Sequence, residues 1–221
     1  MATNFDTDAD GFLTSTEAQA VTHIDIHNNL NDSRVADRTG IEYFTELTWL
    51  NCSFNNLEQL RLSKNTNLVT LLCMNNQLKD LRTENCYRLR NLYCYNNKLN
   101  DAAMKVTIHY LPTCDEPGNL CFFMEGSPDE GNNISMSRLN YLWNTLNWEC
   151  YFSTDGADWL PLRAGDVNRD GQVTSADVAP LADILLGKSA APAIRVDDVN
   201  ADYKFTVADL TKLVEMLVSG K

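Results

Sequence analysis

The strongest constraint on the fold is a repeat of 21 residues between positions 47 and 99. Three consecutive copies share the unit L-x-x-L-x-C-x-x-N-x-x-L. The aligned residues are Leu47, Leu68 and Leu89; Leu50, Leu71 and Leu92; Cys52, Cys73 and Cys94; Asn55, Asn76 and Asn97; and Leu57, Leu78 and Leu99. A short fixed period indicates one supersecondary unit per copy, with neighbouring copies stacked around a continuous core.

Each residue type in the unit has a physical role. The leucines and the cysteine are predicted to point inward from a short strand and its turn. The asparagine side chain is predicted to bond backbone groups of the turn that no sheet ladder reaches. The unit therefore matches the strand and turn of a leucine-rich repeat. A degenerate first copy precedes it at Val21, Ile24, Ile26 and Asn29.

A stack of about four units needs a cover at each end. Segment 101–162 is predicted to supply the C-terminal cover. We expect a helix from Asp101, as its cap, to His109, and strands at Asn119–Met124 and Trp148–Ser153. A second helix is expected near Ser137–Asn147.

The acidic charge of the chain limits which classes of partner it can bind. The net charge is −12 and the isoelectric point is about 4.6, so phosphate backbones would be repelled and no nucleic acid is expected. The acidic residues gather in short Asp-rich runs, which suit a hard cation such as calcium.

The first Asp-rich run, D-T-D-A-D-G-F-L-T-S-T-E at residues 6–17, fits a twelve-residue EF-hand loop. Gly11 permits the sharp turn, and Leu13 is predicted to point into the core. The alternative is a surface turn that binds nothing. The predicted calcium ligands are Asp6, Asp8, Asp10, Phe12 (backbone carbonyl), Thr14 (directly or through water) and Glu17.

Two further loops lie 32 residues apart, and each leads into an apolar helical pattern. They read D-V-N-R-D-G-Q-V-T-S-A-D and D-V-N-A-D-Y-K-F-T-V-A-D. The predicted ligands are Asp166, Asn168, Asp170, Gln172 (carbonyl), Thr174 and Asp177 in the first loop, and Asp198, Asn200, Asp202, Lys204 (carbonyl), Thr206 and Asp209 in the second.

This pair of loops resembles a type I dockerin over residues 165–218. The resemblance implies a module that folds around two calcium ions and binds a cohesin domain of a scaffold protein, as in a cellulosome. It places partner contacts at loop positions 10 and 11, which here are Ser175, Ala176, Val207 and Ala208. Tyr203 replaces the glycine of the second loop, which we expect to weaken that site. The alternative is a purely structural role for the two loops.

The N-terminal part, V-T-H-I-D-I followed by repeats with C-x-x-N, resembles bacterial surface leucine-rich-repeat proteins, notably those of gut anaerobes. That resemblance implies a secreted or cell-surface interaction or adhesion protein. The predicted fold class is α+β: a short repeat solenoid with an α/β cap, then an all-α paired EF-hand-like module. The expected domains are 1–20 (calcium loop and cap), 21–105 (repeats), 106–162 (C-terminal cap) and 163–221 (dockerin-like module).

Side chains alternate between the two faces of a strand, so residues next to the inward leucines point outward. The outward set predicts an apolar and aromatic patch on the concave face of the repeats. A protein or a polysaccharide could bind there. The alternative is that the face packs on the dockerin-like module of the same chain. The patch consists of Trp49, Leu72, Met74, Tyr93 and Tyr95.

Other classes of protein find little support. Motifs such as G-x-S-x-G and H-E-x-x-H are missing, and the clustered carboxylates are already assigned to calcium, so no enzyme is expected. No apolar run approaches the roughly 18 residues of a membrane span. We expect any export signal to lie outside this sequence. The odd count of seven cysteines excludes a complete disulfide framework, although a bridge between Cys114 and Cys121 stays open.

Overall fold

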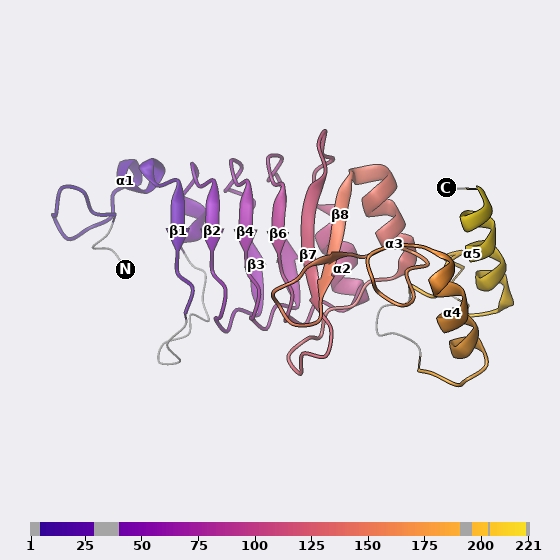
Figure 1. Cartoon of the computed structure of the whole chain (residues 1–221). Coiled ribbons are helices and arrows are strands. Elements are labelled where there is room, and N and C mark those ends of the chain that lie inside the picture. The colour runs from indigo at the N-terminus through magenta and orange to yellow at the C-terminus, as the bar shows by residue number, and fades with distance from the viewer. Residues whose placement is uncertain (1–4, 29–39, 191–195, 203, 220–221) are drawn as a thin grey trace.

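The computed structural model describes residues 5–28, 40–190, 196–202 and 204–219. It is a mixed α/β structure, mostly sheet with a few helices. Short strands follow one another side by side along an elongated body, with the loop before α1 (Ser15–Ala20) at one end and α4 (Val178–Leu185) and α5 (Val207–Ser219) at the other (Figure 1).

The main sheet has seven strands in the order β1-β2-β4-β6-β7-β8-β9. All neighbours are parallel except the last pair, which is antiparallel. The leucines of successive repeats are in register, Leu50 beside Leu71 and Leu71 beside Leu92, as the period predicts. The strands are β1 (His23–Asp25), β2 (Trp49–Asn51), β4 (Thr70–Leu72), β6 (Asn91–Tyr93), β7 (Gly118–Met124), β8 (Trp148–Ser153) and β9 (Leu160–Pro161).

A second sheet, which the sequence analysis did not anticipate, pairs β3 (Gln59–Arg61) with β5 (Asp80–Arg82) in parallel. Leu60 and Leu81 are buried in the same core as the leucines of the main sheet, so the core lies between the two sheets. The short 3-10 helix η2 (Ile41–Tyr43) precedes the first of these repeats.

The predicted helix after the repeats is α2 (Asp101–His109), and it packs on β5. Its N-cap is Asn100 rather than Asp101, because the Asn100 side chain accepts a hydrogen bond from the Ala103 N–H. The Thr107 hydroxyl donates to the Leu81 carbonyl, which ties the helix to the second sheet.

The predicted hydrogen bonds of the repeat asparagines are present, and the stacked asparagines form a ladder. The Asn76 and Asn97 amides each donate to the carbonyl of the cysteine in their own repeat and in the repeat before. Their Oδ1 atoms accept the N–H of Leu57 and Leu78, also from the repeat before. Each asparagine therefore joins two repeats and satisfies buried backbone groups of both.

The segment after the repeats continues the sheet. Strands β7 and β8 add to it in parallel, with Leu120 beside Leu92 and Cys150 beside Leu120. Asn132 continues the ladder, since its amide donates to the carbonyls of Cys94 and Phe122 and its Oδ1 accepts the Leu99 N–H. The second predicted helix consists of α3 (Met136–Tyr141) and the π-helical turn η3 (Leu142–Leu146).

All seven cysteines are free and buried, so the bridge between Cys114 and Cys121 that was left open is not formed. Burial raises the pKa of Cys52 and of Cys121 to about 12. These thiols are therefore protonated apolar core residues at neutral pH.

The C-terminal module has a small core of its own. The 3-10 turn η4 (Ser175–Asp177) leads into α4, and α4 packs on α5. Val167, Leu181, Val199 and Leu213 form the buried centre of this core. Among the described residues, no helix has the combined length and apolar character that crossing a membrane requires.

Candidate calcium loops and the face of the sheet

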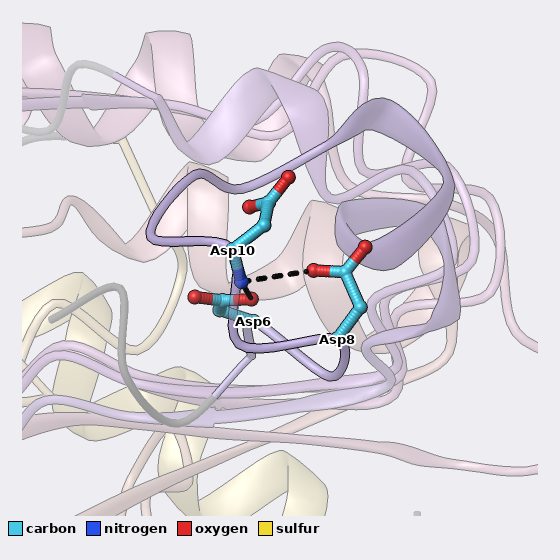
Figure 2. Close-up of side chains that lie close together, drawn as sticks. All are labelled: Asp6, Asp8 and Asp10. Atoms are coloured by element: carbon cyan, nitrogen blue, oxygen red, sulfur yellow. Dashed lines mark hydrogen bonds between the residues drawn. The ribbon is translucent and has the colours of Figure 1, made fainter.

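The three predicted calcium loops share one hydrogen-bonded frame, anchored on the first aspartate. In the N-terminal loop, Asp6 accepts the backbone N–H of Asp10 at 3.2 Å and of Gly11 at 2.9 Å. Asp8 also accepts the Asp10 N–H, and Figure 2 shows the three aspartates gathered around this backbone group. Carboxylate oxygens of Asp6, Asp8 and Asp10 lie within 4.8 Å of one another.

The paired loops repeat this frame. Asp166 accepts the N–H of Asp170 at 3.1 Å and of Gly171 at 2.9 Å, and Asp198 accepts the N–H of Asp202 at 3.1 Å. Asn168 and Asn200 occupy the place of Asp8, and each accepts the N–H two residues further on. Within the described part of the chain, the N-terminal loop is therefore the one loop in which positions 1, 3 and 5 are all carboxylates and lie within 4.8 Å of one another.

The carboxylate at position 12 closes each loop. Asp177 accepts the N–H of Val167, Asn168 and Thr174, and both Asp177 and Asp209 are fully buried. Asp209 accepts the N–H of Asn200 and Thr206 in the same way. Glu17 is bonded likewise by Thr7 and Thr14, and these hydrogen bonds, first of all those from Thr14, lower its pKa to about 2.

The threonines at position 9 have a second role as helix caps. The Thr14 hydroxyl accepts the Glu17 N–H, the Thr174 hydroxyl accepts the Ala176 N–H, and the Thr206 hydroxyl accepts the Ala208 N–H. The carbonyls predicted as ligands at position 7 belong to Phe12, Gln172 and Lys204, three residues that are all exposed. Leu13 was predicted to point into the core, but it is 37% exposed, so that prediction is wrong. Phe5 anchors this loop instead, because its ring packs on Phe44.

Position 4 of every loop is left-handed, which the sequence analysis missed. Ala9, Arg169 and Ala201 have φ of 59°, 60° and 58°. Gly11 and Gly171 supply the predicted positive φ at position 6, while Tyr203 lies outside the described residues. The D-x-[DN]-x-D spacing is the sequence signal for this left-handed residue, because the side chain at position 1 must accept the N–H of position 5.

The electrostatics of the first paired loop favour a bound cation. Burial, together with the negative charges of Asp177 and Asp170, raises the pKa of Asp166 to about 6. A divalent cation would remove this repulsion, and it prefers carboxylate and carbonyl oxygens. The oxygen-rich, negatively charged donor set of these loops therefore fits calcium.

The predicted partner positions of the module, Ser175, Ala176, Val207 and Ala208, are all at least partly exposed. On the helices that follow, the two copies differ: Val207, Val214 and Val218 of α5 are 68%, 43% and 85% exposed. The equivalents 32 residues earlier are Ser175, Ala182 and the exposed Leu186. The second copy thus presents the larger apolar stripe.

The predicted patch lies on one face of the main sheet. Trp49, Leu72, Met74 and Tyr93 are partly exposed there. Tyr95 is covered by Trp159, at 4.8 Å between ring centroids, from the segment before β9 rather than from the C-terminal module. The ring of His23 stacks beside Trp49 at 6.2 Å. Neither His23 nor Trp159 was predicted to belong to this patch. The alternation in V-T-H-I-D-I is the one sequence signal that indicates an outward His23.

These features are similar to those of proteins that combine leucine-rich repeats with a type I dockerin domain, and comparisons with known proteins support that combination. Residues 164–218 match the family model of the dockerin type I domain. Internalin J of Listeria monocytogenes serotype 4b (strain F2365) is 39% identical over 66 residues, which are 30% of this chain and 7% of that protein. The chain thus spans a small part of that relative.

A solved structure described as the functional domain of InlJ from Listeria monocytogenes, which includes a cysteine ladder, is also similar. It shares 31% sequence identity over 57% of this chain and 25% of that chain, with a TM-score of 0.41.

Proposed function

We propose that this chain is a non-catalytic extracellular interaction protein, in which a leucine-rich-repeat solenoid is attached through a calcium-dependent dockerin to a cohesin-bearing scaffold. The observation that carries the proposal is the shared frame of loops 166–177 and 198–209 inside the dockerin match. The loops form a paired EF-hand-like module that holds two calcium ions, with a third at residues 6–17.

Calcium titration by calorimetry on the whole chain tests the metal sites. We expect three sites in the wild type and two in Asp177→Asn, because that change removes the carboxylate that closes one loop. Asp183→Asn, at an aspartate on α4 that pairs with Lys188, is the matched control and should keep three sites. Failure of the wild type to bind calcium would refute the proposal.

Binding to a panel of cohesin domains, with calcium and with chelator, tests the partner. The exposed stripe on α5 predicts that Val207→Lys and Val218→Lys weaken binding. Gln19→Lys, at an exposed residue of α1 at the far end of the chain, should leave binding unchanged (Figure 1). Absence of binding to every cohesin at micromolar concentration would favour the alternative below.

The second candidate is a free-standing adhesin whose calcium loops are only structural. The partly exposed aromatic side chains on the main sheet favour it. Trp49→Ala and Tyr93→Ala should then abolish binding to a protein or polysaccharide target, while Tyr87→Ala, at an exposed tyrosine outside the patch, should not. Catalytic turnover on a substrate panel that persists after chelation would contradict both candidates.

A further inference from the structure

Position 4 of the calcium loops holds alanine twice and arginine once. Ala9, Ala201 and Arg169 share the same left-handed backbone, so alanine satisfies the local geometry. Position 4 is not among the ligand positions of an EF-hand loop. Coordination of calcium therefore does not explain the long side chain of Arg169.

The Arg169 side chain reaches the end of the repeat sheet. Its guanidinium pairs with the carboxylate of Glu125, directly after β7, and lies 5.3 Å from the ring centroid of Phe152 on β8. The side chain is only 9% exposed and Phe152 is fully buried. The Glu125 N–H donates to the Ser153 carbonyl at 2.8 Å, so Glu125 lies where the end of β7 is hydrogen-bonded to the end of β8.

Neighbouring residues extend this contact. A Cβ on Gly171 would lie 3.5 Å from Pro161 of β9, so the loop backbone packs against the last strand of the sheet. The Gly165 N–H donates to the carbonyl of Val196, whose side chain is buried in the core of the repeats. The first paired loop is therefore seated on the C-terminal end of the sheet.

We propose that loop 166–177 is a calcium-controlled clamp, in which the bound cation holds Arg169 against Glu125 and Phe152 and so fixes the dockerin module on the repeats. This inference rests on the calcium binding proposed above. Without the cation, the carboxylates of Asp166, Asp170 and Asp177 repel one another, and an opened loop withdraws Arg169. Because coupling between two sites is reciprocal, the end of the sheet in turn strengthens calcium binding at this loop.

Hydrogen exchange on the full chain, with calcium and with chelator, tests the clamp. In the wild type, calcium should slow exchange of the amides in β7 and β8 by about fivefold or more. In Arg169→Ala, calcium should still protect the amides of loop 166–177 but no longer those of the strands, because alanine fits position 4. Arg61→Ala, which removes the exposed ion pair with Asp80, is the matched control and should behave as the wild type.

Two results would overturn the clamp while leaving calcium binding intact. One is strand exchange in the wild type that is identical with and without calcium while the loop is protected. The other is equal protection of the strands in Arg169→Ala and the wild type. Absence of loop protection in the wild type would instead refute calcium binding, and the clamp with it.

Discussion

Replacement of Asn97 by alanine should destabilise the repeats strongly. The Asn97 side chain is fully buried and accepts the Leu78 N–H at 2.9 Å. Its amide donates to the carbonyls of Cys94 at 2.9 Å, Cys73 at 3.1 Å and Tyr95 at 3.3 Å. All three carbonyls keep another donor, from Asn132, Asn76 and the Asn75 N–H respectively. The Leu78 N–H is therefore the group that loses its acceptor.

The size of the effect follows from these contacts. A buried N–H without an acceptor costs about 1–3 kcal/mol, and the two hydrogens that the Asn97 amide donates contribute about 1 kcal/mol each. The free energy of unfolding should fall by about 4 kcal/mol. With a urea dependence of about 3 kcal/mol per molar, the unfolding midpoint should drop by about 1 M.

Urea unfolding followed by circular dichroism, with calcium present throughout, measures this change. Asn67→Ala is the control, because the Asn67 amide bonds the exposed Glu46 side chain and its loss should cost below about 1 kcal/mol. Equal midpoints for Asn97→Ala and Asn67→Ala would refute the reasoning that the ladder holds the repeats together.

Three other predictions concern buried groups. The native thiols should react with a disulfide reagent only on unfolding, since a pKa of about 12 for Cys52 lowers its thiolate fraction at pH 8 by about three orders of magnitude; rapid native reaction would contradict this. The raised pKa of Asp166 means that its contribution to the stability of the calcium-free module is present below pH 3.8 and lost as the pH rises through about 6. Calcium should therefore raise the melting temperature more at pH 7.5 than at pH 5. An equal rise at both pH values would contradict this role of Asp166. Gly118→Ala should cost about 1–3 kcal/mol in urea unfolding, because the new Cβ would lie 2.8 Å from the Trp148 ring; an unchanged midpoint would show that the ring moves freely.

The repeats could be predicted from the sequence because each copy has the same length. Leu50, Leu71 and Leu92 stand at a constant interval, and so do their ladder asparagines. Strands β7 and β8 continue the same sheet, but insertions separate Leu120 and Cys150 from that period. No periodicity search could therefore find them as further strands of the stack.

Other features depend on contacts between distant segments. Asn132 takes its place in the ladder because the chain after β7 turns back along it, and Asn132 itself bonds the Phe122 carbonyl of that strand. Trp159 covers Tyr95 across a separation that no local pattern encodes. The strand β3 did leave a local signal, the alternation of Leu60 and Leu62 with charged Arg61, and only its pairing with β5 required the structure.

The last strand of the main sheet has a consequence for how copies of this chain behave together. Parallel in-register strands form an edge on which a second chain can add by backbone hydrogen bonding, the route by which sheet proteins aggregate. Strand β9 ends this sheet with two residues in an antiparallel pairing, and one of them, Pro161, has no N–H to donate. The sheet that is extended by one parallel repeat after another therefore ends in a strand that disfavours the addition of a neighbouring molecule at this edge.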